Sequence, residues 1–309
     1  MRRLASLSHR HAASAAGALA ISLLLATATG AAAQIHPGSY VTVFHTTTVA
    51  AGHAGAATAT CPTGNRAITG GAYWHRSGQN GDPALLAVLR SSAPTSDMLG
   101  WYTAGANDSA ETLYLTTTVQ CLPKNTVGSF TVKSREVTVD PVRPGNADLR
   151  CGAGQKVMSG GGVWHKPGQA PKAGLIGRLT GSIPDTDGNG WTVIGRNDGT
   201  SILNLRVTAL CVSSSVIGAA TSDTFFVPGS FNGTPEHYLV CPTGTLAIGG
   251  GYYWTHQTYA GGLMNFDTRN TIVSSTVTGD GTSWYAGARN TDNFETTTFS
   301  VWYVRCLPA

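Results

Sequence analysis

The sequence predicts an all-β protein made of three homologous units, each closed by a disulfide. Three observations support this fold class: six cysteines at regular intervals, short segments in which apolar and polar residues alternate, and no helical periodicity after the N-terminal region. Only 12% of the 309 residues are charged, and 39 are glycine. This composition favours strands and turns over solvated helices, which need charged residues on their outer faces.

The N-terminal segment, residues 1–33, has the features of a secretory signal. Arg2 and Arg3 precede an apolar run from Gly17 to Leu25, and Ala31–Ala33 supply a small-residue cleavage site. The apolar run is too short to span a bilayer, which takes about 20 residues. We therefore expect a bacterial Sec-type signal peptide, a secreted mature protein and no membrane insertion.

The rest of the chain contains a threefold repeat of about 90 residues. The opening cysteines Cys61, Cys151 and Cys241 are 90 residues apart, and the closing ones are Cys121, Cys211 and Cys306. Other residues recur between them: a glycine doublet, a first tryptophan, a second tryptophan (Trp101, Trp191, Trp284) and an asparagine (Asn107, Asn197, Asn290). Such self-similarity defines repeats at residues 34–123, 124–213 and 214–309.

The repeat selects one disulfide pairing out of 15: Cys61–Cys121, Cys151–Cys211 and Cys241–Cys306. Paired cysteines are expected in an exported chain. Each bond closes a loop of about 60 residues, which stabilises the folded state by roughly 4 kcal/mol in the chain-entropy description.

Each repeat is predicted to contain about six short antiparallel strands. The segment before Cys121 alternates strictly, with Leu113, Leu115 and Val119 on one face. Further strands are predicted at Tyr40–Thr48, Phe130–Val139, Lys156–His165 and Trp191–Arg196. We expect three sandwich-like or barrel-like units in tandem; the alternative is one β-prism-like body with pseudo-threefold symmetry.

The repeated pattern, Cys-Pro-x-Gly, a glycine doublet or triplet, Gly-Trp, Asn and a closing Cys, resembles repeat modules of secreted proteins of actinobacterial type. The resemblance covers all three units, although Cys151–Gly154 lacks the proline and Ser283-Trp284 replaces Gly-Trp in the third. These modules have no established activity. The resemblance implies secretion and modularity, and it transfers no site residue.

The candidate binding residues are a tryptophan and a histidine that recur in each repeat: Trp74 and His75, Trp164 and His165, and Trp254 and His256. An indole face can stack on a sugar ring while a histidine bonds its hydroxyls. The competing interpretation is that each indole fills the core against the glycine doublet, with the histidine pointing outward from the same strand.

Charge is unevenly distributed over the three repeats. The first has a net charge of −1, the second has 11 Lys+Arg against 6 Asp+Glu, or +5, and the third has −3. The middle repeat suits an anionic polysaccharide, or the acidic third repeat of a second molecule in self-association. No basic tract of the nucleic-acid kind is present.

No catalytic or cofactor motif stands out. The sequence lacks a G-x-S-x-G elbow, an H-E-x-x-H pair and a phosphate-binding loop, and we expect no cofactor and no metal. Residues 185–190 imitate the start of a calcium loop, but Arg196 stands where its glutamate should be, so we interpret them as a turn.

These observations favour a secreted, non-catalytic protein that recognises carbohydrate or a cell surface, with three repeats acting multivalently. Two other functions are carried forward: a structural, adhesive or protein-interaction role in a secreted assembly, and a hydrolase with a site built across repeats.

Overall fold

The structure is a computed structural model that describes residues 40–82, 85–126, 130–171, 175–185, 187–217, 221–229, 234–256, 265–266, 270–290 and 298–308. All of these belong to one compact unit, residues 32–309. The predicted signal peptide, residues 1–33, lies outside the described residues.

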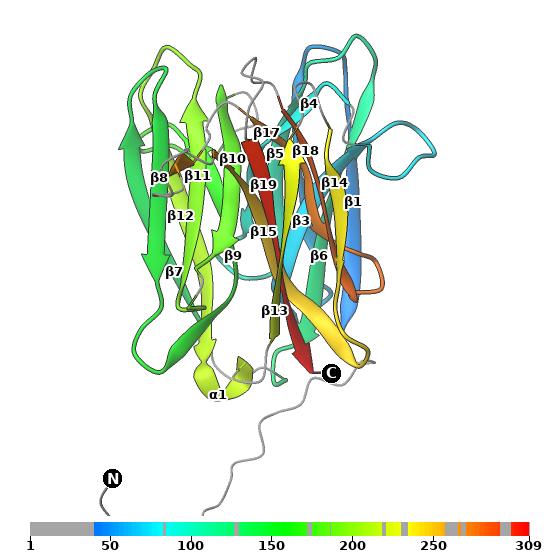
Figure 1. Ribbon diagram of the computed structural model, residues 1–309, viewed down its shortest axis with the longest axis vertical. Helices are drawn as coiled ribbons and strands as arrows, with labels where there is room; N and C mark the ends of the chain where they lie inside the picture. The colour runs from blue at the N-terminus through cyan, green and yellow to red at the C-terminus, as the bar shows by residue number, and fades with distance from the viewer. Residues whose placement is uncertain are drawn as a thin grey trace, which may run out of the picture. The chain divides into compact units, whose positions relative to one another are not determined.

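The all-β prediction is confirmed, and the described secondary structure is almost entirely strand (Figure 1). The first repeat contains β1 (Val41–Val49), β2 (Ala54–Thr60), β3 (Asn65–His75), β4 (Ala87–Pro94), β5 (Gly100–Asn107) and β6 (Leu113–Pro123). The second contains β7 (Phe130–Val139), β8 (Pro144–Arg150), β9 (Gln155–His165), β10 (Gly177–Pro184), β11 (Gly190–Asn197) and β12 (Leu203–Ser213), followed by the short helix α1 (Ser214–Ile217). The third contains β13 (Thr221–Gly229), β14 (Glu236–Val240), β15 (Thr245–His256), β16 (Asn265–Phe266), β17 (Thr271–Val277), β18 (Ser283–Arg289) and β19 (Thr298–Pro308).

The strands form three antiparallel sheets, each built from two repeats. Sheet A has the order β1-β6-β3-β17-β18-β14, and sheet B has the order β2-β5-β4-β9-β12-β7. Sheet C has the order β13-β19-β15-β10-β11-β8, with β16 beside β15. Each repeat therefore divides its strands between two sheets, and the three repeats close into a cycle. This is the arrangement of the single pseudo-threefold body. The expected row of three separate units is corrected, because no repeat pairs its six strands with one another alone.

The seam between two repeats depends on the second glycine of each doublet. At each seam a strand of one repeat passes close to the doublet of the next. A Cβ added to Gly71, Gly161 or Gly251 would overlap the carbonyl oxygen of Ser275, Ser92 or Ser182, respectively. Only glycine allows the two backbones to approach so closely.

The first glycine of each doublet makes room for the second tryptophan of the same repeat. A Cβ on Gly70 or on Gly160 would lie 2.6 Å from the indole of Trp101 or Trp191. The second tryptophans therefore fill the core, and their indole nitrogens donate to serines of the neighbouring strand. The bonds are Trp101 to Ser92 (2.9 Å), Trp191 to Ser182 (3.0 Å) and Trp284 to Ser275 (3.2 Å). The three serines and the three first glycines line a cavity of about 20 Å³ where all repeats meet.

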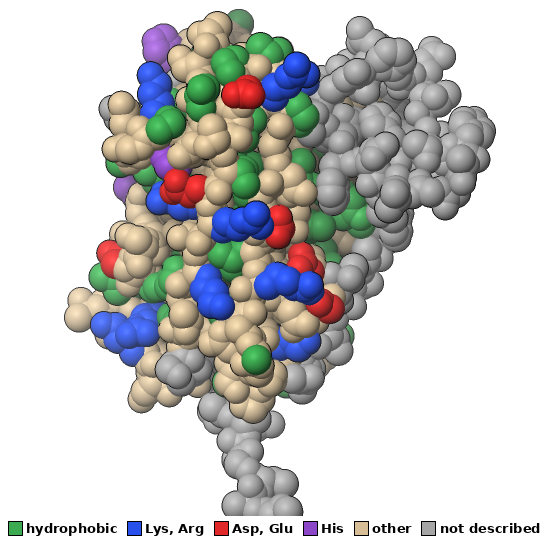
Figure 2. Space-filling model, turned by 90° about the vertical axis from the view of Figure 1, so that its left-hand side faces the viewer, with side chains coloured by type: hydrophobic (Ala, Val, Ile, Leu, Met, Phe, Trp, Pro, Cys, Tyr) green, Lys and Arg blue, Asp and Glu red, His purple; other side chains and the backbone are tan. Residues whose placement is uncertain are grey.

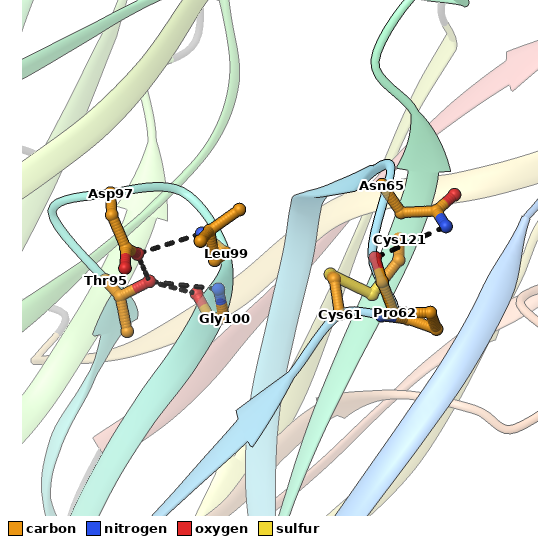
Figure 3. Close-up of a disulfide and its surroundings, with 8 residues drawn as sticks. All are labelled: Cys61, Pro62, Asn65, Thr95, Asp97, Leu99, Gly100 and Cys121. Carbon is orange, nitrogen blue, oxygen red and sulfur yellow. Dashed lines mark hydrogen bonds between the residues drawn. A yellow bond between two sulfur atoms is a disulfide. The ribbon is translucent and has the colours of Figure 1, made fainter.

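The disulfide prediction is confirmed for all three pairs: Cys61–Cys121, Cys151–Cys211 and Cys241–Cys306. The bond between Cys61 and Cys121 lies near the turn from Thr95 to Gly100 (Figure 3). In this turn the Asp97 carboxylate accepts hydrogen bonds from the Thr95 hydroxyl (2.6 Å) and the Leu99 amide (2.9 Å). Three disulfides indicate that the protein resides in an oxidising compartment.

The segment that imitates a calcium loop is a turn of the same kind. Asp187 accepts a hydrogen bond from the Asn189 amide (2.8 Å) and pairs with Arg150. The third repeat has the same geometry at Asp280, whose carboxylate accepts a hydrogen bond from the Thr282 amide (3.1 Å). The turn interpretation of residues 185–190 fits these bonds.

Candidate functional site

The first tryptophan of each repeat lies in the core. The exposed fractions of Trp74, Trp164 and Trp254 are 0%, 1% and 0%, and all three belong to one hydrophobic cluster shared by the repeats. A Cβ on Gly105 would lie 2.7 Å from the indole of Trp74, so this ring is covered by the backbone of β5. The predicted stacking faces are therefore not available to a sugar, and the competing core interpretation applies.

The histidines that follow two of these tryptophans point to the opposite face of the sheet. His75 is half-buried, stacks on Tyr114 with ring centroids 5.5 Å apart, and contacts the Thr116 hydroxyl through Nε2 (2.9 Å). His165 is buried, and its Nε2 lies 3.0 Å from the Glu136 carboxylate. Both side chains have partners within the protein. The side chain of His256 lies outside the described residues.

A groove of about 230 Å³ opens on the outer face of sheet A, where the first repeat meets the third; we call it groove A. Tyr73 and Tyr285 line it because each neighbours a buried tryptophan on its strand and so points outward. Its lining also includes Phe44, Asn80, Tyr238 and Thr276. Strands β1, β3, β14, β17 and β18 all contribute to it.

The aromatic side chains of groove A differ in exposure. Phe44 is 50% exposed and Tyr238 is 52% exposed, whereas Tyr285 is buried. Tyr238 packs against Tyr285 with ring centroids 4.7 Å apart. The Tyr285 hydroxyl donates to Glu236 (3.0 Å), and burial together with this carboxylate raises the pKa of Tyr285. Tyr285 therefore stays protonated and supports the exposed ring of Tyr238.

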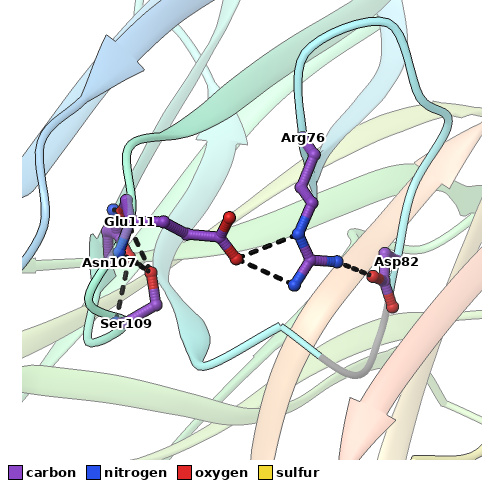
Figure 4. Close-up of polar contacts among 5 residues, drawn as sticks. All are labelled: Arg76, Asp82, Asn107, Ser109 and Glu111. Carbon is purple, nitrogen blue, oxygen red and sulfur yellow. Dashed lines mark hydrogen bonds and ion pairs between the residues drawn. The ribbon is translucent and has the colours of Figure 1, made fainter.

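The loop that borders groove A is held by an ion-pair network (Figure 4). Arg76 pairs with Asp82 (2.7 Å) on one side and with Glu111 (2.8 Å) on the other. Gly81, near the tip of this loop, lies against Tyr285, since an added Cβ would come within 2.8 Å of the ring. The network fixes the loop beside the aromatic floor of the groove.

Sheet B carries a second groove, of about 300 Å³, at the equivalent seam between the first and second repeats; we call it groove B. Its position follows from the repeat: Tyr102 corresponds to Tyr285, Thr58 to Tyr238 and Val163 to Tyr73. Arg206, Thr208 and Pro171 complete the wall. The two grooves are thus formed by equivalent strands of the repeated backbone and differ in their side chains.

The sequence contains only a faint signal for these grooves. Tyr102 and Tyr285 each follow a second tryptophan directly, so a repeated outward aromatic position can be read in two repeats. Phe44 and Tyr238 have no such signal, because they come from different repeats and meet only through sheet A.

No protein-family model matches this sequence, and no curated protein matches it. The described residues contain no group of three or more His, Cys, Asp or Glu side chains placed to hold a metal ion. Within the same part of the chain, no helix has the length and apolar character needed to cross a membrane.

Proposed function

We propose that this protein is a secreted, non-catalytic carbohydrate-binding protein and that groove A holds a neutral sugar. The observation that carries the proposal is the pair of half-exposed aromatic rings, Phe44 and Tyr238, on a groove large enough for one sugar ring. Pyranose rings have an apolar C–H face that packs on aromatic side chains, with hydroxyl partners around it.

The polar groups of groove A suit sugar hydroxyls. Asn80 lines the groove with an exposed amide that can bond a sugar hydroxyl. Thr276 and Thr278 also line it, and the Thr278 hydroxyl is bonded to Asp280 (2.6 Å). The Thr276 hydroxyl also bonds to Thr118 across Gly71, which fixes its position. A neutral, partly apolar and partly hydroxyl-lined groove favours a saccharide over a charged ligand.

The lining of groove A also favours binding over catalysis. None of the described residues that line it is an aspartate, glutamate, histidine, cysteine or lysine. Hydrolysis of a glycosidic bond needs a pair of carboxylates on either side of the scissile bond. Groove A offers no such pair.

Binding to an array of neutral oligosaccharides tests the proposal. We expect Tyr238→Ala and Phe44→Ala to weaken binding by about threefold to tenfold each, the effect of losing one aromatic contact. Because both side chains are about half exposed, the variants should keep the melting temperature of the wild type within a few degrees.

Val240→Ala is the matched control, because Val240 lies two residues after Tyr238 on β14 and is 65% exposed. It should leave binding unchanged. Failure of the wild-type protein to bind any neutral oligosaccharide, together with concentration-dependent assembly, would replace this proposal by the structural or protein-interaction role.

A further inference from the structure

Groove B lacks the half-exposed aromatic rings of groove A and is lined by the guanidinium of Arg206. Arg206 in sheet B occupies the position that Thr116 has in sheet A. On the neighbouring strands, Thr116 lies opposite Thr46 and Tyr73. Arg206 lies opposite Glu136 and Val163. Groove B therefore has Val163 where groove A has Tyr73, and it is lined by Arg206, whereas Thr116 is not among the residues that line groove A.

The charge of Arg206 is only weakly compensated. Its Nη1 lies 3.7 Å from Oε1 of Glu136, which is beyond hydrogen-bond distance, and one third of its side chain is exposed. Glu136 has closer partners, since His165 Nε2 is at 3.0 Å and Asn204 Nδ2 is at 3.3 Å. Asn204 donates a hydrogen bond to this carboxylate, and Arg206 at 3.7 Å does not, which leaves guanidinium N–H groups of Arg206 for a ligand.

The second repeat also lacks the two acidic residues that pair with Arg76 in the first repeat. Arg76 is paired with Asp82 and Glu111, whereas in the sequence the corresponding positions of the second repeat are Lys166, Lys172 and Ser201, so neither acidic residue recurs. The middle repeat as a whole has a net charge of +5. Figure 2 shows Lys and Arg side chains spread over the face around β7 and β8, with Asp and Glu between them. The net positive charge of the middle repeat favours an anionic ligand over a cationic one.

We propose that groove B is a second saccharide site, one that takes an acidic sugar with its anionic group on Arg206. A guanidinium offers paired N–H donors in a planar fork, the geometry that matches a carboxylate or a sulfate ester. Tyr102, Thr58 and Thr208 border the groove and contact the ring that carries the anionic group. The ligand class rests on the proposed function, but the site itself does not depend on groove A.

The test measures binding of a galacturonate hexasaccharide by calorimetry, with its methyl ester as the neutral counterpart and a sulfated galactan hexasaccharide as the second anionic probe. We expect the wild-type protein to bind the free acid at least tenfold more tightly than the ester. Arg206→Gln should lose about tenfold or more of the affinity for the acid and little of that for the ester. The sulfated probe shows whether the site distinguishes the two anions.

Arg135→Gln is the matched control for net charge. Arg135 lies on the neighbouring β7, is 54% exposed at its side chain and pairs with Asp148, outside groove B. This variant should change the affinity for the acid by less than about twofold. An equal loss in Arg135→Gln and Arg206→Gln would overturn the site, because it would reduce the effect to long-range attraction by the middle repeat. Equal binding of acid and ester by the wild type would overturn it as well.

The outcomes for the two grooves are separable. Arg206→Lys keeps the charge and loses the fork, so it should retain part of the affinity for the acid if Arg206→Gln proves poorly folded. Loss of neutral binding in Tyr238→Ala with unchanged acid binding would support both grooves. If the protein binds the free acid through Arg206 but binds no neutral sugar, the site in groove B is supported and the site in groove A is refuted.

Discussion

Groove A and groove B lie at equivalent seams of two sheets, yet they present different chemistry. Groove A has Tyr73 and Tyr238 where groove B has Val163 and Thr58, and the second repeat has Ser134 at the sequence position of Phe44. Beneath both grooves the same inward set recurs: a glycine at the seam, a serine and a tryptophan. The difference teaches that the repeated residues build the frame, while the outward residues of the same strands are free to diverge.

The largest expected effect comes from breaking the frame that both grooves share. Gly71→Ala should lower the free energy of unfolding by about 3 kcal/mol or more, because the new methyl group overlaps the backbone of Ser275 at the seam. Chemical denaturation measures the change. Gly152→Ala is the control, since its added carbon meets only the flexible ends of Gln155 and Lys133, and it should stay within about 0.5 kcal/mol of wild type. A Gly71→Ala variant as stable as this control would show that the seam is not closed as described.

A smaller effect should follow from making groove B resemble groove A. Thr58 faces Tyr102 across β2 and β5, as Tyr238 faces Tyr285 across β14 and β18. The double variant Tyr238→Ala, Thr58→Tyr should therefore bind neutral sugars about threefold or more tightly than Tyr238→Ala alone. Thr60→Tyr, two residues further along β2 and outside the lining of groove B, is the control. No gain in the double variant would mean that the aromatic pair alone does not make a sugar site.

The smallest expected effect is a loss of stability in acid, which arises in the turns that border the two grooves. Hydrogen bonds from Thr95 and from Thr278 lower the pKa of Asp97 and of Asp280, respectively. A carboxyl group with a lowered pKa stabilises the folded state above its unfolded pKa of about 3.9, and this contribution is lost as the pH falls through the folded pKa.

We expect each of these aspartates to contribute less than about 1 kcal/mol, because both turns are largely exposed. The stability of the wild-type protein should fall more steeply below pH 4 than that of an Asp97→Asn, Asp280→Asn double variant. If the free energy of unfolding of both proteins changes with pH in the same way, the two aspartates make no pH-dependent contribution to stability.

Residues that recur at fixed offsets were sufficient to predict much of the fold. The cysteine spacing predicted all three disulfides, and period-two alternation predicted the strand that is β6. The further strand predictions coincide with β1, β7, β9 and β11. The glycine doublets predicted room for an indole, which the second tryptophans occupy. The repeated asparagine also has a frame role, since Asn107 donates to the Val49 carbonyl (2.9 Å) and Asn197 to the Val139 carbonyl (3.0 Å).

The candidate site could not be predicted in the same way. Repetition drew attention to Trp74, Trp164 and Trp254, but a residue kept in every repeat is needed by the frame, and these indoles are buried. The outward histidine was predicted correctly from alternation for His75, yet alternation does not say which side chains surround it.

By itself, the sequence determined the repeats, the disulfide pairs, the strand pattern and the face of the sheet on which each residue lies, because all of these depend on local spacing. Only the tertiary structure decided that each sheet joins two repeats. That pairing brings Phe44 to Tyr285, 241 positions apart in the chain, and sets Arg206 beside Thr58. The physical reason is that backbone hydrogen bonds at a sheet edge accept any strand of matching register, so packing at the seam glycines, and not local sequence, selects the partner.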